Sequence, residues 1–141
     1  MAEAIARHHV DKGLLGATDT FFIASAGLQA SDGIPTSAET INTLDEMGIR
    51  YDGRSKRLTE LMIHKASLVF CMTASQRAAA AELVASSPED AAKIVQLDPE
   101  RDIEDPVGMG QGAYDALGRR LMILIPHRLK EMLQVTSAPQ K

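Results

Sequence analysis

Apolar residues along this chain gather into short runs that predict strands and into longer, spaced patterns that predict helices. The short runs, rich in branched or aromatic residues, lie at residues 20–25, 67–72 and 93–97. A nearly continuous apolar run such as 67–72 is typical of a strand covered on both faces. Helical spacing marks residues 2–12 and returns from Gly112 onward, where apolar residues recur every three or four positions. Helices that alternate with strands predict an α/β domain with a mainly parallel sheet.

Three further helical segments begin at residues whose side chains can cap a helix. Serine and threonine hydroxyls accept hydrogen bonds from the N–H groups that the first turn leaves free. The capped helices predicted in this way are residues 36–47, 60–65 and 74–86. Pro126 is expected to bend the last helix, because it removes one backbone donor. We expect residues 1–134 to form a single domain and residues 135–141 a disordered tail.

Composition narrows the class of protein. With 141 residues and 45% hydrophobic content, the chain has the size and the apolar material for one core. The formal net charge is -4 and the basic residues at 50–57 are spaced rather than continuous, so no broad positive surface for nucleic acid is expected. The single cysteine excludes an internal disulfide, and the longest apolar run near the C-terminus is too short to span a bilayer. A soluble cytoplasmic protein is therefore expected.

Residues 102–112 are the first candidate for chemistry. They place Glu104 beside Asp105, then Pro106, and then three glycines before the last helix. Proline fixes the backbone after the acids, glycines allow close approach, and the negative charge of Glu104 is expected to raise the pKa of Asp105. Taken alone, the window favours a solvated surface turn, because the same residue types are common in any turn.

Several stretches, in this order and spacing, resemble the low-molecular-weight protein phosphatases, small cysteine-dependent enzymes that act on phosphotyrosine or, in one bacterial branch, on phosphoarginine. The stretches are Met1-Ala2-Glu3-Ala4, Ser25-Ala26-Gly27, Gly48-Ile49, Leu58-Thr59, residues 68–73 and Asp102-Ile103-Glu104-Asp105-Pro106. The resemblance covers nearly the whole chain. It implies a three-layer α/β fold with a mainly parallel, four-stranded sheet flanked by helices, and a hydrolase of phosphorylated proteins that uses no cofactor and no metal.

The resemblance also implies roles for individual residues. Asp105 matches the family's general acid, which protonates the departing group and later activates water. Val107 and Gly108 stand at the substrate rim, where the family commonly has an aromatic ring after the Asp-Pro pair, so stacking on phosphotyrosine is put in doubt. The residues implied to support the site are Pro106, Glu104 and Ser25, of which Ser25 matches a serine that braces the phosphate-binding loop.

The family's nucleophile has no match among these residues. In the family a central strand and a loop of the form Cys-x5-Arg-Ser-Pro directly precede the Met-Ala-Glu-Ala helix, which here begins at Met1. We therefore expect that strand and loop to lie upstream, and the chain alone to be inactive, because the loop stabilises the transferred phosphoryl group. Cys71 lies in an apolar strand and is interpreted as an inert structural thiol. Gly53 stands where some members carry a histidine that braces the loop, so that contact is lost or replaced.

Three interpretations stay open. The chain belongs to a phosphatase whose nucleophile lies upstream, or it is a non-catalytic phosphatase-like binding domain or a catalytically dead truncated product, or it is an unrelated small α/β domain. A sheet without its central strand would expose two inner edges. Such edges predict either that the first strand shifts to close the gap or that the chain self-associates.

The remaining polar clusters have simpler interpretations. The four histidines are expected to be solvated side chains rather than metal ligands, because no further histidine or cysteine stands three or four positions from any of them. The glycines at 108–112 match nucleotide-binding loops only weakly. Arg54, Lys56 and Arg57 either steer an anionic substrate or are simply solvated.

Overall fold

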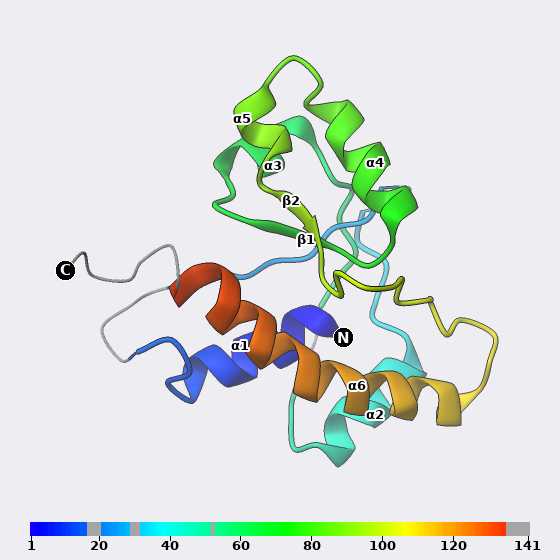
Figure 1. Cartoon of the computed structure of the whole chain (residues 1–141). Coiled ribbons are helices and arrows are strands. Elements are labelled where there is room, and N and C mark those ends of the chain that lie inside the picture. Colours follow the sequence, from blue (N-terminus) through cyan, green and yellow to red (C-terminus); the bar gives the residue numbers. More distant parts are fainter. Residues whose placement is uncertain (17–20, 29–31, 52, 135–141) are drawn as a thin grey trace. The chain divides into compact units, whose positions relative to one another are not determined.

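The computed structural model describes residues 1–16, 21–28, 32–51 and 53–134, and the chain divides into two compact units. The helical unit contains Met1–Ser25, Thr36–Gly53 and Pro106–Lys141. The sheet unit contains Ala26–Pro35 and Arg54–Asp105. In chain order the elements, most of them labelled in Figure 1, are α1 (Ala2–Asp11), α2 (Ala38–Glu46), α3 (Glu60–Lys65), β1 (Val69–Cys71), α4 (Ala74–Leu83), α5 (Pro88–Ala91), β2 (Ile94–Gln96), α6 (Gln111–Leu129) and the π-helical turn η1 (Lys130–Gln134).

Two parallel strands form the sheet of the sheet unit. β1 pairs with β2 so that Val69 lies opposite Ile94 and Cys71 lies opposite Gln96. α4 follows β1 in the chain and contacts both strands (Figure 1). Strands joined through a helix in this way are the α/β arrangement that the apolar runs predict, so the fold class is confirmed. The buried cluster of this unit consists of Ile63, Cys71, Ala80, Val84 and Ile94.

Hydroxyl side chains begin helices as predicted. Thr59 Oγ1 accepts a hydrogen bond from Met62 N at 3.2 Å, and Thr73 Oγ1 accepts one from Gln76 N at 3.0 Å. In α2 the cap is Ser37, one residue later than the capping-box spacing indicates. Local sequence signals therefore place these helix starts to within a residue.

α4 ends earlier than predicted, at Leu83, and a further short helix follows. Ser87 caps α5 by accepting a hydrogen bond from Asp90 N at 3.3 Å, and Pro88 takes a position in the first turn. Serine followed by proline is a helix-start signal. The alanine-rich run before it hides that signal, because alanine favours a continuous helix.

Three helices pack together in the helical unit. α6 contacts both α1 and α2, and its buried residues include Tyr114, Leu121 and Ile125. At Gly118 the helix packs closely on α2, since a Cβ added there would lie 2.6 Å from Thr43 Cγ2. The absence of a side chain at this position lets the two helices approach.

The strand predicted at residues 20–25 is wrong for its described part. Residues 21–25 form no strand, and Phe22 is 91% exposed; Thr20 lies outside the described residues. A strand needs a neighbouring backbone for its N–H and C=O groups, and within the described ranges residues 21–25 have no strand partner. Instead, the Arg7 guanidinium of α1 donates to Ile23 O at 2.6 Å.

The sheet is therefore smaller than expected. The described residues contain two strands rather than the three that the apolar runs predict, and the shift of a first strand into the sheet is not seen among them. Self-association through the sheet edges stays a prediction, which sedimentation velocity would test.

Pro126 does not end the last helix. α6 runs through it to Leu129 and continues into η1, and the bend expected at Pro126 stays a prediction. The tail predicted at 135–141 lies outside the described residues. Within the described ranges, no helix is both long enough and apolar enough to cross a bilayer.

Candidate active site

The acidic loop is anchored at the end of β1. Ile103 N donates to Met72 O at 2.8 Å, and the Ile103 side chain is 3% exposed. Met72 directly follows β1, so this bond fixes the loop at the carboxyl end of that strand. The buried Ile103 side chain and this backbone hydrogen bond thus fix the position at which the two acids, Glu104 and Asp105, follow.

Asp102 gives the loop a second anchor. Its Oδ1 accepts hydrogen bonds from Ala74 N at 2.9 Å and from Gln96 Nε2 at 3.0 Å. Ala74 is the first residue of α4 and Gln96 is the last of β2, so one carboxylate joins the loop to a helix start and to the second strand. A negative charge at a helix N-terminus is favourable. Sequence reasoning named Asp102 only as part of a motif and missed this anchoring role, because its backbone partner lies 28 positions away and no spacing rule connects the two.

Glu104 and Asp105 follow these anchors and are both exposed. The carboxyl ends of parallel strands form the edge at which open α/β sheets bind ligands. The loop therefore holds two exposed carboxylates beside the edge where chemistry is expected, while its first two residues fix the backbone. The role of Asp105 as a general acid stays a prediction.

Pro106 begins a tight turn that belongs to the helical unit. Pro106 is buried, and its carbonyl oxygen accepts a hydrogen bond from Met109 N at 3.0 Å. Gly108 has a φ of +79°, in the left-handed region that other residues rarely adopt. The turn exposes Val107 (69%) and Met109 (70%). Two exposed apolar side chains thus stand directly after the acidic pair.

Ser25 meets a buried carboxylate in the helical unit. Its Oγ donates to Glu3 Oε1 at 2.6 Å, and Tyr51 Oη donates to the same oxygen at 3.1 Å. Arg7 forms an ion pair with Glu3 Oε2 at 3.1 Å. Burial, and next the charge of Glu3, raise the pKa of Tyr51. Ser25 is therefore held in a network with Glu3, a residue that sequence reasoning used only as part of a helix motif.

Tyr51 fills the space beside Gly53. A Cβ added at Gly53 would lie 2.0 Å from Tyr51 Oη, a separation that real atoms do not reach. Glycine is thus the residue that lets the Tyr51 hydroxyl reach Glu3. The Tyr51 side chain thus occupies the space that a side chain at position 53 would fill.

Cys71 has the surroundings of a structural thiol. It lies in β1 with 8% of its surface exposed, and burial raises the pKa of its thiol, against a smaller lowering by Arg77. A nucleophilic cysteine needs a lowered pKa and access to substrate. Both the burial and the direction of the shift agree with the interpretation of Cys71 as inert.

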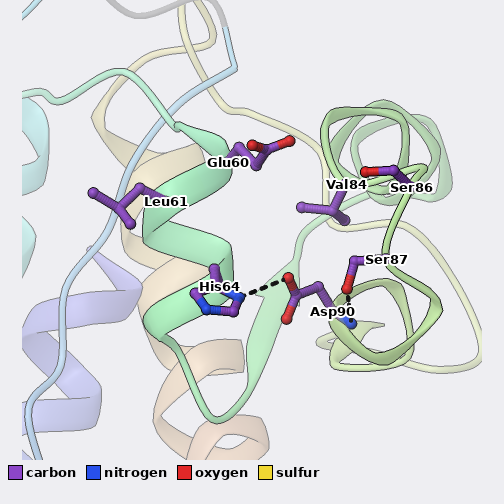
Figure 2. Close-up of a pocket in the computed structure, with 7 residues that line it drawn as sticks. All are labelled: Glu60, Leu61, His64, Val84, Ser86, Ser87 and Asp90. Atoms are coloured by element: carbon purple, nitrogen blue, oxygen red, sulfur yellow. Dashed lines mark hydrogen bonds and ion pairs between the residues drawn. The ribbon is translucent and has the colours of Figure 1, made fainter.

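A pocket of about 310 Å³ in the sheet unit contains none of the predicted site residues (Figure 2). Figure 2 shows His64 of α3 pointing toward Asp90 of α5, with His64 Nδ1 3.0 Å from Asp90 Oδ2. Lys93 Nζ lies 2.8 Å from Asp90 Oδ1 and donates to His64 O at 2.8 Å. Because the buried Asp90 carboxylate is engaged on both oxygens, the cluster ties α3 to α5 and is structural. The residues lining the pocket are Glu60, Leu61, His64, Val84, Ser86, Ser87 and Asp90.

The expectation for His64 is thus corrected. Its side chain is 69% exposed, as predicted, but it pairs with Asp90 instead of meeting only solvent. The partner lies 26 positions away, beyond the helix spacing that the prediction used. Within the described residues, no group of three or more acidic, histidine or cysteine side chains is placed to hold a metal ion.

Asp90 makes stability depend on pH. Hydrogen bonds from Lys93 and then His64 hold the pKa of Asp90 at about 2, against an ordinary value of 3.8. An acid whose pKa is lower in the folded state than in the unfolded state stabilises the fold at pH values above its unfolded-state pKa. This stabilisation is lost as the pH falls through the folded-state pKa. We expect Asp90→Asn to be less stable than the wild type above pH 4 and the difference to vanish as the pH approaches 2. Urea unfolding of both proteins across this pH range measures the difference in stability. A difference that is constant with pH would contradict the stabilising role of the Asp90 carboxylate.

Comparisons with known proteins identify similar chains. A family model described as "Low molecular weight phosphotyrosine protein phosphatase" matches residues 1–137. Among curated proteins, none matches. A low molecular weight protein tyrosine phosphatase from T. tengcongensis is 34% identical, and the match covers 94% of this chain and 88% of that one with a TM-score of 0.77. The YwlE arginine phosphatase from Geobacillus stearothermophilus is 29% identical over 99% of this chain and 88% of its own, with a TM-score of 0.78. A YwlE mutant from Bacillus subtilis has a TM-score of 0.80 at 24% identity, with 94% and 88% of the two chains covered.

Proposed function

Since this chain belongs to the low molecular weight phosphotyrosine protein phosphatase family, we propose that it carries the acid half of a protein phosphatase site for phosphotyrosine or phosphoarginine. The observation that supports the proposal is the acidic loop. Asp102 and Ile103 fix it at the carboxyl ends of β1 and β2, and Asp105 follows, exposed. That is the edge of an α/β sheet where a substrate would bind.

In the proposed reaction a cysteine thiolate attacks phosphorus in line, and the bond from phosphorus to the tyrosine oxygen or arginine nitrogen breaks. Asp105 gives its proton to the departing atom, so that the leaving group does not depart as an anion. Water then attacks the cysteinyl phosphate. Asp105 takes the proton from that water, which releases phosphate and restores the thiolate.

The nucleophile is proposed to be a cysteine that these 141 residues do not contain. Cys71 is the chain's one cysteine, and it is buried with a raised pKa. A phosphate-binding loop would also supply the arginine and the backbone amides that stabilise the transferred phosphoryl group. The residues proposed to support the site from this chain are Pro106, Glu104 and Ser25, with Val107 and Gly108 at its rim.

The experiment compares the 141-residue chain with the same chain extended at its amino end by a strand and a Cys-x5-Arg-Ser-Pro loop. Hydrolysis of a phosphotyrosine peptide and of a phosphoarginine peptide is measured for both. We expect activity only in the extended chain, and we expect Cys71→Ala to leave that activity in place. Which peptide is hydrolysed assigns the substrate.

Two results would overturn the proposal. Activity in the 141-residue chain that Cys71→Ala abolishes would make Cys71 the nucleophile. A folded but inactive extended chain would favour the alternative, a phosphatase-like domain that binds a partner without catalysis.

A further inference from the structure

Three basic side chains in the sheet unit are exposed and, within the described residues, form no ion pair. Arg54, Lys56 and Arg57, here called the basic ridge, are all exposed. In the part of the chain that the structure describes, no carboxylate forms an ion pair with any of them. Asp32 Oδ1 accepts a hydrogen bond from the backbone N of Arg57 at 2.9 Å.

The backbone of the ridge is held from two sides. On one side, Gly27 N donates to Lys56 O at 2.8 Å. On the other, Ser55 N donates to Ile34 O at 2.8 Å, and Ser55 O accepts from Gly33 N at 2.8 Å. Neighbouring residues of an extended segment direct their backbone groups to opposite edges, so the ridge lies between two bonded segments. A backbone fixed in this way loses little further conformational entropy when the segment binds another molecule.

We propose that the basic ridge binds an extended acidic segment of the phosphoprotein substrate, and this rests on the proposed function. The whole chain has a formal net charge of -4, so an acidic segment is repelled by the protein as a whole and attracted at this ridge. Side chains on alternate residues of an extended segment repeat at about 6.4–6.8 Å. Arg54 and Lys56 have this spacing in sequence, and alternate carboxylates of an extended acidic peptide repeat at the same distance.

The chemistry of the ridge favours carboxylates over nucleic acid. An arginine side chain can bind a carboxylate through two parallel hydrogen bonds. Binding to a nucleic-acid backbone depends instead on many phosphate contacts made by a broad positive surface. Three cations on an acidic protein are few for that purpose, and they suffice for a short run of aspartates or glutamates.

The test measures binding of a fluorescent peptide of alternating glutamates, without phosphate, to the 141-residue chain by anisotropy at low and at physiological salt. The ridge variant is Arg54→Gln/Lys56→Gln/Arg57→Gln. The matched control is Lys12→Gln/Lys65→Gln/Lys130→Gln, which removes the same charge from three other exposed positions. At low salt we expect the ridge variant to bind about 10- to 100-fold more weakly and the control to bind nearly as well as the wild type. A third variant, Arg54→Lys/Arg57→Lys, keeps the charge but loses the paired hydrogen bonds, so its affinity should lie between those of the ridge variant and the wild type.

Each other outcome overturns the inference. Equal losses in the ridge variant and the control would show an effect of net charge alone, and equal binding by all variants would exclude the ridge. If the ridge bound a single-stranded oligonucleotide more tightly than the peptide, its ligand would be nucleic acid and not an acidic segment. Since the peptide carries no phosphate, the result is independent of catalysis: an inactive extended chain that binds it contradicts only the proposed function, and an active one that ignores it contradicts only this inference.

Discussion

Replacing Asp105 by asparagine is expected to lower hydrolysis by the extended, active chain by about 100- to 10,000-fold, the range that general acid–base catalysis contributes. Asparagine has the same shape, but it cannot give a proton to the departing atom or take one from water. The side chain at 105 is exposed, so the loss is expected in the rate constant and not in folding. Steady-state rates for Asp105→Asn and the wild type, with unfolding curves for both, measure the effect.

The matched control for this variant is Asp45→Asn, the same chemical change at an exposed aspartate of α2. It should hydrolyse substrate at the wild-type rate. The loss in Asp105→Asn should also be smaller for an aryl phosphate whose phenol is a good leaving group, because such a group departs without a proton. Wild-type activity in Asp105→Asn, or an equal loss with good and poor leaving groups, would remove Asp105 from the role of acid.

Two glycines of α6 are expected to respond to alanine in opposite directions. At Gly118 the new Cβ would lie 2.6 Å from Thr43 Cγ2 and 2.7 Å from Met47 Cε. The flexible end of Met47 can move aside. Thr43 cannot turn freely, because it is 1% exposed and its Oγ1 donates to Asp115 at 2.6 Å and accepts from Gln111 at 3.0 Å.

Magnitudes decide the sign of the change at Gly118. Alanine improves helix propensity by about 1 kcal/mol. Overpacking costs about 1–3 kcal/mol, and loss of a Thr43 hydrogen bond costs about 1 kcal/mol more. We expect Gly118→Ala to lower the free energy of unfolding by about 1–3 kcal/mol.

Gly112 is the matched control in the first turn of the same helix. Nothing lies within 4 Å of a Cβ added there, so Gly112→Ala should stabilise the fold by about 0.5 kcal/mol. Urea unfolding followed by far-ultraviolet circular dichroism measures both variants. A Gly118→Ala protein at least as stable as Gly112→Ala would mean that α2 and α6 do not pack as described.

Features set by neighbouring residues were predictable from the sequence. Thr59 and Thr73 begin helices through bonds that span three residues. The apolar runs around β1 and β2 were long enough to mark strands without knowledge of their partners. Their parallel pairing followed from the helices between them.

Features that depend on distant residues were not predictable. Residues 21–25 have the composition of a strand, but a strand exists only where a second backbone lies beside it. The anchoring of the acidic loop by Asp102, and the meeting of Ser25, Tyr51 and Glu3, join positions with no regular spacing. The sequence could therefore suggest Asp105 as the acid, while the contacts that fix its loop required the structure.

The division of the chain into two units bears on the order in which they fold during synthesis. The sheet unit is built mostly from the continuous stretch Arg54–Asp105, whereas the helical unit joins α1 and α6 from opposite ends of the chain. Closing a long loop costs entropy before any contact forms, and a nascent chain emerges from the ribosome with its N-terminus first. We expect the sheet unit to form first. Ile5 of α1, fully buried in the finished protein, would then stay exposed to solvent until α6 has been made.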